Sequence, residues 1–426
     1  MPKHILTQYS LQTTRFKVME RIIKDERLTL RVEVRKKSAA CPLCHEETHQ
    51  GYDRRKNESR IRYETWHGCA IDLLVRKRRF RCLNANCSTG VFTELIEGVA
   101  RPFERYVSAF SEQCLGTLAT QNFGQTQQEH RVSFGTVATM LERAVPLALT
   151  VEDWRRIFPK GEIIVLGIDE HSFRKRHFAL TITNVTTGEL IAILPDATQS
   201  RLEGFLGSIP SDVRSRISCV AMDLTNRYAA AVRRWCKHTR IAVDHFHLIQ
   251  LANRLLWHER SVIEGGIGGT AHPVKHFMLL LKGKERLSKN EREVVEKIFQ
   301  DPACAKLKLA YDTKEELRAS LRLKNHTEAI SRFLALTRCD AWNRERVTRQ
   351  ELLKYSKAFR TFIGTLQKYR DEIITFIETR VTNAVTEGIN TKIKLLKRMS
   401  YGIPNLIHYM KRIILAFRPE LSTHHV

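Results

Sequence analysis

An unbroken apolar run near the middle of the chain predicts the strand around which the other elements are arranged. Residues 162–169 contain six consecutive positions that are apolar or glycine, and they end on Asp169. A run without alternation is typical of a strand that is buried on both faces. We therefore predict a central strand that stops at Asp169 and holds this carboxylate at the rim of a sheet.

The residues after this strand predict a mixed sheet with helices. Turn residues separate two further strands, which complete a three-strand antiparallel meander over residues 178–184 and 190–194. Helices and strands then alternate: a helix over 202–206, a strand over 217–222, a helix over 228–236, a strand over 241–243 and an amphipathic helix from 248 onward. The fourth strand also leads to an acid, Asp223. The predicted order is β-β-β-α-β-α-β-α.

A late amphipathic segment, residues 383–402, carries a third acid on one helical face. Its apolar stripe consists of Ile389, Ile393 and Leu396. Residues three, four and seven positions apart share a helix face. By this rule the polar face consists of Asn383, Glu387, Asn390, Lys394 and Arg398. A carboxylate flanked by amides and cations suits a site for a metal and a phosphate, with the two cations as candidate DNA contacts.

These elements carry a resemblance. Acids that end the first and fourth strands resemble the RNase H-like core of nucleases and transposases, which places those strands side by side. The late helix is similar to the signature of the ISL-three family of bacterial insertion-sequence transposases, in the motifs Glu387-Gly-Ile-Asn390, Lys392-Ile-Lys394, Lys397-Arg398 and Tyr401-Gly402. Further similar motifs, spread over nearly the whole chain, are Gly167-Ile-Asp169-Glu-His171, Met222-Asp223, Asp244-His-Phe-His247 and Cys41-Pro-Leu-Cys44.

The resemblance implies a metal-dependent active site. Asp169, Asp223 and Glu387 would be a catalytic triad that binds Mg²⁺ or Mn²⁺. Two divalent ions about 4 Å apart generate a nucleophile and stabilise a leaving oxygen in phosphodiester cleavage, and carboxylates are suitable ligands for Mg²⁺. Asp244 and His247 have a supporting role that stays open, because Asp244 could cap the following helix or the pair could brace the site.

Four cysteines near the N-terminus predict a structural zinc site. Residues 18–23 and 28–35 are expected to form a hairpin that leads into Cys41-x2-Cys44, and Cys82-x4-Cys87 supplies a second pair. Tetrahedral Zn²⁺ needs four soft ligands that are brought together in this way. Two alternatives remain open: the second pair are ordinary buried thiols, or a histidine replaces one ligand, the candidates being His45, His49 and His67.

Two stretches beside the cysteines are candidates for DNA binding. Five of six residues just before Cys82 are cationic and could contact phosphates, namely Arg76, Lys77, Arg78, Arg79 and Arg81. A helix from 101 to 120 is expected next, and residues 123–130 and 133–141 then predict a helix-turn-helix with Ser133 as an N-cap. The second of these helices would present Phe134, Thr136 and Thr139 to DNA and bury Val137, Met140 and Leu141.

A long helical insertion is expected between the second and third acids. Asp223 and Glu387 are 164 positions apart, and residues of about 258–380 are amphipathic throughout. If both acids serve one site, this block must leave the sheet and return beside it. The glycine run over 265–269 is a candidate flexible entry, and it lacks the lysine and hydroxyl residue of a nucleotide phosphate-binding loop.

Composition narrows the class of partner. The 426 residues, 42% of them hydrophobic, suffice for two or three domains with a sizeable core, and the net charge of +25 favours a polyanion. No apolar run approaches the roughly 18 residues of a membrane span, and the N-terminus lacks a signal-peptide core. We therefore expect no membrane partner, a cytoplasmic, nucleoid-associated protein, and ten cysteines that are reduced or bound to metal.

We expect an α/β protein in three parts: a zinc-binding β module over 1–98, a helix-turn-helix over 99–150, and an RNase H-like catalytic domain with its all-α insertion over 160–426. The expected function is a transposase that binds the terminal inverted repeats of its element and a target duplex, as a homodimer or higher oligomer, and that cuts and joins strands with Mg²⁺. Two alternatives are a DNA-binding regulator with a zinc ribbon and helix-turn-helix, and an RNase H-like nuclease that does not join strands.

Overall fold

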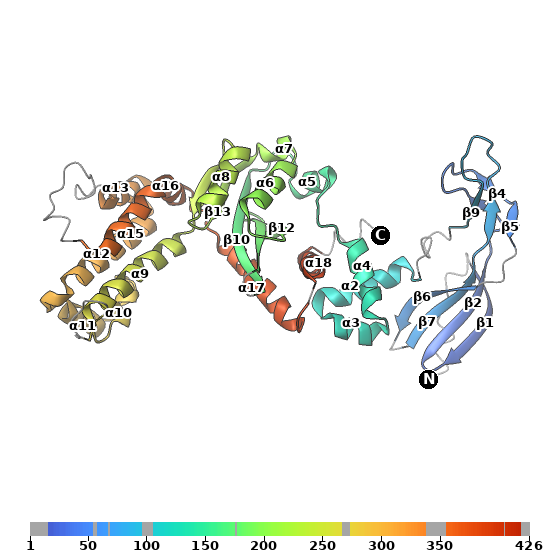
Figure 1. Cartoon of the computed structure of the whole chain (residues 1–426), viewed down its shortest axis with the longest axis horizontal. Coiled ribbons are helices and arrows are strands. Elements are labelled where there is room, and N and C mark those ends of the chain that lie inside the picture. Colours follow the sequence, from blue (N-terminus) through green and yellow to red (C-terminus); the bar gives the residue numbers. More distant parts are fainter. Residues whose placement is uncertain are drawn as a thin grey trace. The chain divides into compact units, whose positions relative to one another are not determined.

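The computed structural model describes residues 16–53, 58–66, 69–95, 105–174, 177–265, 273–337, 355–403 and 405–418. The chain forms two compact units, one of residues 1–148 with 393–426 and one of residues 149–392. Figure 1 labels most of the elements of both units. None of the helices in the described ranges is both long and apolar enough to cross a membrane.

The first unit begins with a four-stranded sheet in the order β1-β2-β7-β6. Its strands are β1 (Phe16–Lys24), β2 (Arg27–Val34), β6 (Glu58–Trp66) and β7 (Cys69–Arg76). β1 and β2 pair as the expected antiparallel hairpin. Asp72 on β7 is 1% exposed, and the guanidinium groups of Arg27 and Arg62 donate to its carboxylate. Burial of this acid is tolerated because both of its oxygens are paired with cations.

Short strands form a small module around the cysteines. They are β3 (Ala39–Ala40), β4 (Glu47–Thr48), β5 (Gly51–Asp53), β8 (Arg79–Arg81) and β9 (Val91–Thr93), arranged in a two-stranded sheet β3-β4 and a three-stranded sheet β5-β8-β9. Only a few apolar side chains are buried here, among them Phe80 and Phe92, whose rings stack 6.1 Å apart. So small a core is usual in modules that depend on a bound metal for stability.

In its described residues the first unit also contains the helices α2 (Ser108–Thr120), α3 (Phe123–His130), α4 (Phe134–Ala144) and α18 (Leu406–Phe417). The expectation that the first of these helices begins near residue 101 is wrong for residues 105–107. Arg105 and Val107 instead exchange backbone hydrogen bonds with Arg62 on β6, which holds this segment extended. α18 packs on α2 and α4.

The second unit is built on a five-stranded sheet in the order β12-β11-β10-β13-β14. Its strands are β10 (Ile164–Arg174), β11 (His177–Asn184), β12 (Glu189–Leu194), β13 (Ile217–Met222) and β14 (Arg240–Val243). The first three are antiparallel, and β13 and β14 run parallel to β10. The expected meander is confirmed, and β10 and β13 are neighbours as predicted. The expectation that β10 stops at Asp169 is wrong, because the strand continues to Arg174 in pairing with β11.

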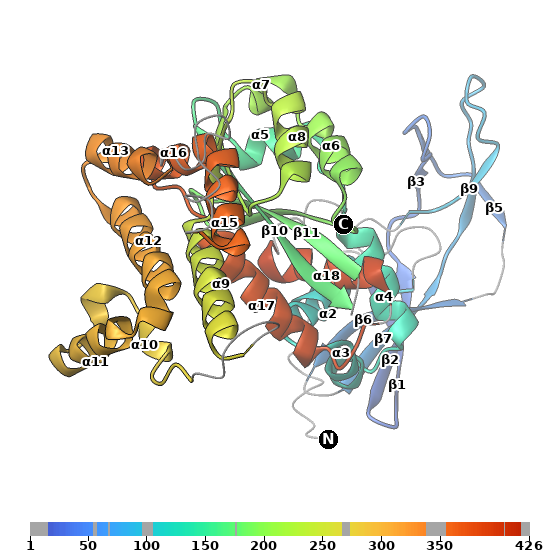
Figure 2. The ribbon, with the colours of Figure 1, turned by 60° about the vertical axis from the view of Figure 1, so that its left-hand side comes forward.

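Both faces of this sheet are covered, as the unbroken apolar run predicted. Leu166 and Ile168 face a core formed with α5 (Val151–Ile157), α6 (Gln199–Ser208), α7 (Ser211–Arg214) and α8 (Asn226–Trp235). In Figure 2 α6, α7 and α8 lie together at the top of the view, above β10 and β11. On the other face Val165 packs against a second core that continues into the helices after β14. β10 is therefore a central strand whose alternate side chains pack into two different cores.

The block between the acids is helical in its described part. After α9 (His245–Ile263) come α10 (Met278–Leu281), α11 (Lys289–Gln300), α12 (Ala305–Arg322), α13 (His326–Thr337), α15 (Lys357–Lys368) and α16 (Arg370–Thr379), with short 3₁₀ turns at Lys284–Arg286 and Pro302–Cys304. α16 packs on β14, so the block does return to the sheet. Residues 266–269 of the glycine run lie outside the described residues. α17 (Ala384–Met399) follows and carries the third acid.

Candidate functional site

The parallel strands place three aspartates at equivalent positions. Ile168 on β10 is paired in register with Met222 on β13, and Met222 with Val243 on β14. The next residue along the chain is an aspartate in each case: Asp169 on β10, Asp223 just after β13 and Asp244 just after β14. Equivalent positions on neighbouring strands are about 5 Å apart. The sequence prediction placed two acids side by side, and the register brings a third, Asp244, into the same row.

α17 binds the sheet through buried polar side chains. Asn383, just before the helix, donates from Nδ2 to the carbonyl of Ile168 at 2.9 Å. One turn later the hydroxyls of Thr386 and Thr183 are 2.8 Å apart. Asn390 donates to Asp169 Oδ2 at 2.7 Å and accepts from the Thr181 hydroxyl at 2.6 Å. The helix is therefore fixed in rotation and in height along the sheet, since each bond has its own partner on β10 or β11.

Gly167 makes this close approach possible. A Cβ atom at this position would lie 2.1 Å from Thr386 Oγ1 and 2.7 Å from Thr183 Oγ1. Thr183 and Thr386 are both fully buried in a close-packed interior, so neither side chain has free space into which it could move. Glycine is needed at residue 167 so that α17 can lie against β10 at the height of Asp169.

The polar face predicted for this helix divides in two. Asn383 and Asn390 are 0% and 2% exposed and bind the sheet, whereas Lys394 and Arg398 are exposed. Glu387 lies between these groups and is partly exposed. Burial, reinforced by the negative charges of Asp244 and Asp223, raises the pKa of Glu387. The carboxylate of Glu387 is therefore close enough to Asp244 and Asp223 for their charges to affect its pKa.

The negative charge of Asp169 is unfavourable in its buried position, and hydrogen bonds offset part of that cost. Burial and then the neighbouring charge of Asp223 raise its pKa to about 6. Its Oδ1 accepts from the backbone N–H of Glu170 at 2.7 Å, and Oδ2 accepts from Asn390. A cation among these acids would remove the repulsion that raises the pKa.

Among the described residues of the second unit, Asp223, Asp244 and His247 form a group that could hold a metal ion. One ligand atom from each lies within 4.8 Å of the other two. His247 Nε2 is 2.9 Å from Asp223 Oδ1, and this bond raises the pKa of His247. Asp244 accepts from the N–H of Phe246 at 3.1 Å and so caps α9, as one of the two sequence interpretations expected. The cap turns His247 toward Asp223.

The donor set fits a hard divalent ion. Asp223 and Asp244 supply carboxylate oxygens and His247 supplies an imidazole nitrogen; among the described residues, Asp169 and Glu387 lie outside this 4.8 Å group. Oxygen ligands of this kind suit Mg²⁺ and Mn²⁺, and the imidazole makes the group more suitable for Mn²⁺ than oxygen donors alone. The Asp223 side chain is 36% exposed, so a phosphate oxygen and water can reach the group.

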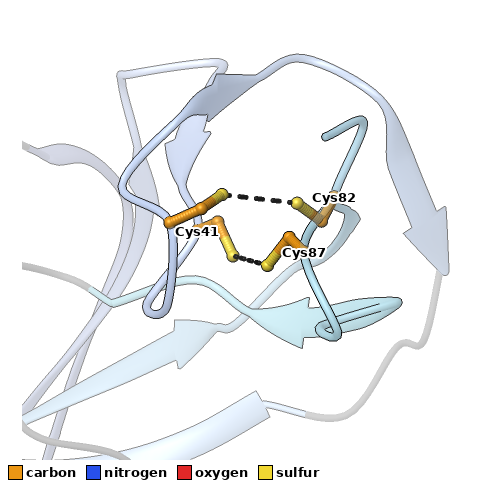
Figure 3. Close-up of side chains that lie close together, drawn as sticks. Cys41, Cys82 and Cys87 are labelled. Atoms are coloured by element: carbon orange, nitrogen blue, oxygen red, sulfur yellow. Dashed lines mark hydrogen bonds between the residues drawn. The ribbon is translucent and has the colours of Figure 1, made fainter. Parts of the chain in front are cut away.

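The four predicted cysteine ligands converge in the first unit (Figure 3). Sulfur atoms of Cys41, Cys44, Cys82 and Cys87 all lie within 4.8 Å of one another. Burial opposes ionisation of Cys41, but the backbone N–H groups of Cys44 and Leu43 outweigh it and lower the pKa of this thiol to about 6. The described histidines proposed as substitutes, His45 and His49, are not in the group, and His67 lies outside the described residues. The geometry is compatible with Zn²⁺.

The cationic run before Cys82 is partly engaged within the module. Arg78 donates to both carboxylate oxygens of the buried Glu94 and to the carbonyl of Lys36. The guanidinium groups of Arg79 and Arg81 lie 5.2 and 5.6 Å from the ring centroid of Tyr52. Arg76 and Arg81 are exposed, and Lys77 and Arg79 are partly so. Arg78 is therefore engaged within the module, and the ring of Tyr52 has the guanidinium groups of Arg79 and Arg81 close to it.

The two helices predicted as a helix-turn-helix form at the expected residues. Arg131 ends α3 in the left-handed conformation, and Ser133 caps α4 by accepting from the N–H of Thr136 at 3.2 Å. Val137, Met140 and Leu141 are buried as expected. Phe134 is 42% exposed, with the rest of its ring packed on Phe123 and His408. Thr136 and Thr139 are partly exposed.

Of the residues that fix α17 to the sheet, sequence reasoning named Asn383 and Asn390, and it named Gly167 only within a family motif. It did not single out the hydroxyl residues, which are Thr181, Thr183 and Thr386. One signal was available: two threonines at alternate positions of an otherwise apolar strand predict a polar stripe on one sheet face. Thr386 is three positions after Asn383, so it shares the same helix face.

Comparisons with known proteins identify the family of this chain. The model of the ISL3 family, described as transposase, matches residues 166–413. The transposase for insertion sequence element IS1001 of Bordetella parapertussis is 22% identical over 355 residues, which cover 82% of this chain and 81% of that protein. The transposase for insertion sequence element IS1557 of Mycobacterium tuberculosis is 22% identical over 325 residues, or 69% of each chain. Because the family match spans more than half of the chain and includes Asp169, Asp223 and Glu387, this protein belongs to the ISL3 family of transposases.

Proposed function

We propose that this protein binds the terminal inverted repeats of an insertion sequence and catalyses divalent-metal-dependent cleavage and transfer of DNA strands. Its family indicates a DNA-modifying enzyme that uses a divalent ion. The observation that carries the finer proposal is the row of aspartates on paired strands beside a helix that presents Glu387. The order of the five strands also supports an RNase H-like core.

In this proposal Asp169, Asp223 and Glu387 hold Mg²⁺ or Mn²⁺. The bound ions would supply activation of the attacking oxygen and stabilisation of the leaving oxygen. Asn390 orients the Asp169 carboxylate, and the bonds from α17 to β10 and β11 keep Glu387 at a constant height beside it. The protein thus contributes a preorganised set of anions, which needs little rearrangement when DNA binds.

Asp244 and His247 act as positioning residues in this scheme. His247 fixes one oxygen of Asp223, and Asp244 fixes the start of α9 that carries His247. Residues that orient ligands in this way tune metal affinity, typically by ten- to a hundredfold. Both are also close enough to Asp223 to share the ion.

The first unit would bind the element ends. Zn²⁺ held by the four cysteines would stabilise the module that carries Arg76, Lys77, Arg78, Arg79 and Arg81, whose cations contact phosphates. α4 would present Phe134, Thr136 and Thr139 to the major groove, and Lys394 and Arg398 on α17 add further phosphate contacts. Two ends must be joined in one reaction, so we propose a homodimer or a higher oligomer on DNA.

The test is incubation of the purified protein with DNA that carries its element's termini, target DNA and Mg²⁺, followed by separation of the products. We expect cleaved ends and target-joined strands, and neither when EDTA replaces Mg²⁺. Cleavage without joining would assign an RNase H-like nuclease. Specific binding of the ends without cleavage would assign a DNA-binding regulator.

A further inference from the structure

A tyrosine at the end of α17 stands almost wholly in solvent on a strained turn. Tyr401 is 91% exposed, and its φ is 48°. Gly402 follows with φ 93°. The left-handed region is open to glycine but unfavourable for a bulky side chain. A helix usually ends on glycine at such a position, so an aromatic residue here needs a reason other than stability of the turn.

The turn is held rigidly on the side away from the tyrosine ring. Arg412 on α18 is 1% exposed, and it donates to the carbonyl of Leu396 at 3.0 Å and also to the Ser400 hydroxyl. The same arginine donates to the carbonyl of Gln121 at the end of α2. Ile403, just after the turn, is 7% exposed. Hydrogen bonds and burial therefore anchor both ends of the turn, and the Tyr401 side chain between them is exposed.

Cations lie on the helix that leads to this ring. Lys394 and Arg398 are exposed and four positions apart, so they share a face of α17. The carbonyl of Arg398 accepts from the N–H of Tyr401 at 3.2 Å, so the backbones of these two residues are one turn apart. A flat ring next to exposed cations is complementary to a nucleobase next to its phosphates.

We propose that Tyr401 is a stacking platform for a nucleobase that is unstacked from its neighbours, as in single-stranded or distorted DNA, while Lys394 and Arg398 contact the adjacent phosphates. The inference rests on the proposed function, which supplies DNA as the partner. It adds a residue that distinguishes unpaired from paired DNA. Backbone strain that the surrounding structure maintains is typical of functional positions. A fully paired duplex offers no free base face to the ring.

The experiment measures affinity of the full-length protein for two probes that differ in one feature. One is a duplex with a three-nucleotide single-stranded gap, and the other is the same duplex without the gap. Stacking on one base contributes about 1–3 kcal/mol, so wild type should prefer the gapped probe by roughly five- to a hundredfold. Tyr401→Gly removes the ring but suits the left-handed turn, and should abolish that preference while binding to the paired duplex stays unchanged. Tyr401→Phe should keep it.

Matched variants separate stacking from charge and from folding. Lys394→Ala and Arg398→Ala should weaken binding to both probes equally and reduce the salt dependence. Phe178→Ala removes another exposed aromatic, on β11, and should change neither affinity. The melting temperature of Tyr401→Gly should not fall, because the substitution relieves an unfavourable φ.

Several outcomes would overturn the inference. Equal binding of both probes by wild type, or an unchanged preference in Tyr401→Gly, removes the stacking role. A change in oligomeric state of Tyr401→Gly, with the probe preference intact, assigns the ring to contact with a second copy of the chain. Each of these leaves cleavage and joining by the wild-type protein untouched, so they are distinct from a failure of the proposed function.

Discussion

The cysteine group of the first unit and the acidic group of the second differ in what brings their side chains together. The four cysteines lie in two short turns, within 47 residues of one another, in a module with a small apolar core. The acids come from three strands and a helix, and the hydrogen bond between Asn390 and Asp169 joins residues 221 positions apart. A bound metal can organise the first group, whereas the fold must organise the second before any metal binds.

The comparison predicts the largest effect for loss of an acid. Asp169→Asn, Asp223→Asn and Glu387→Gln each keep the side-chain shape and remove a metal-binding charge. We expect strand cleavage and joining to fall by about a thousandfold or more, since the charge stabilises both reacting oxygens. End binding should hold, or rise slightly as repulsion of phosphate decreases. Gel assays of cleavage and of binding on the same DNA measure both, and full cleavage by one variant would remove that residue from the triad.

Loss of a cysteine should damage the first unit alone. Cys41→Ser or Cys82→Ser should remove one zinc per chain and leave the N-terminal module sensitive to protease, because structural zinc contributes its binding free energy to folding. Residues 149–392 should keep their protease resistance. Metal analysis and limited proteolysis provide the readouts, with Cys304→Ser as the control in a helical region far along the chain. Zinc content equal to that of wild type would contradict the assignment.

The same difference explains what the sequence could predict. Spacing alone singled out the four cysteines that the structure brings together, since residues in turns depend on local chain geometry. Periodicity identified β11, β12, β13 and α17, because burial of apolar residues dominates there. It failed at the contact between α17 and the sheet, where Asn383, Thr386 and Asn390 are buried although they are polar. Periodicity sorts residues by polarity, so it assigns buried hydrogen-bonded residues to the solvent face.

A substitution at Gly167 should break the acidic group from within. In Gly167→Ala the new methyl group would overlap Thr386 Oγ1, and we expect a loss of about 3 kcal/mol in the free energy of unfolding. Catalysis should fall by roughly a hundredfold as α17 and Glu387 are displaced. Gly364→Ala, at an exposed helical glycine with open space around it, should instead stabilise by about 0.5–1 kcal/mol.

A double variant tests whether the overlap is the cause. Thr386→Ala removes the hydroxyl that the new methyl group meets, so Gly167→Ala should cost less in that background. Chemical denaturation of the four proteins gives the coupling energy. Strictly additive effects would show that the overlap with the Thr386 hydroxyl is not the cause of the loss.

The acidic group should also respond to pH in the metal-free protein. The folded-state pKa values of Asp169 and His247 are raised, to about 6 for Asp169, so the folded state holds these protons more tightly than the unfolded state. Their contribution to stability is therefore present at low pH and is lost as pH rises through the folded-state values. We expect on the order of 1–2 kcal/mol between pH 5 and 7.5 relative to Asp169→Asn, which lacks the acid. Mg²⁺ should reverse the trend at pH 7.5. Identical pH profiles of wild type and Asp169→Asn would contradict this account.

The smallest effect should come from the helix proposed to read DNA, and it concerns discrimination rather than chemistry. Thr136 and Thr139 are partly exposed on α4. The Thr139 hydroxyl donates to the carbonyl of Gly135 at 2.8 Å, which leaves the Thr139 methyl group to contact a base. Replacing both threonines with alanine should reduce the preference for element ends over random DNA by about fivefold, because single base contacts are worth about 1–3 kcal/mol. Affinity for random DNA should stay constant, since phosphate contacts carry it.

Thr361→Ala is the matched control, because its hydroxyl makes the same bond to the carbonyl four residues earlier on α15. If discrimination survives in the double variant, α4 does not read the ends, and specificity in the first unit must come from the cysteine module.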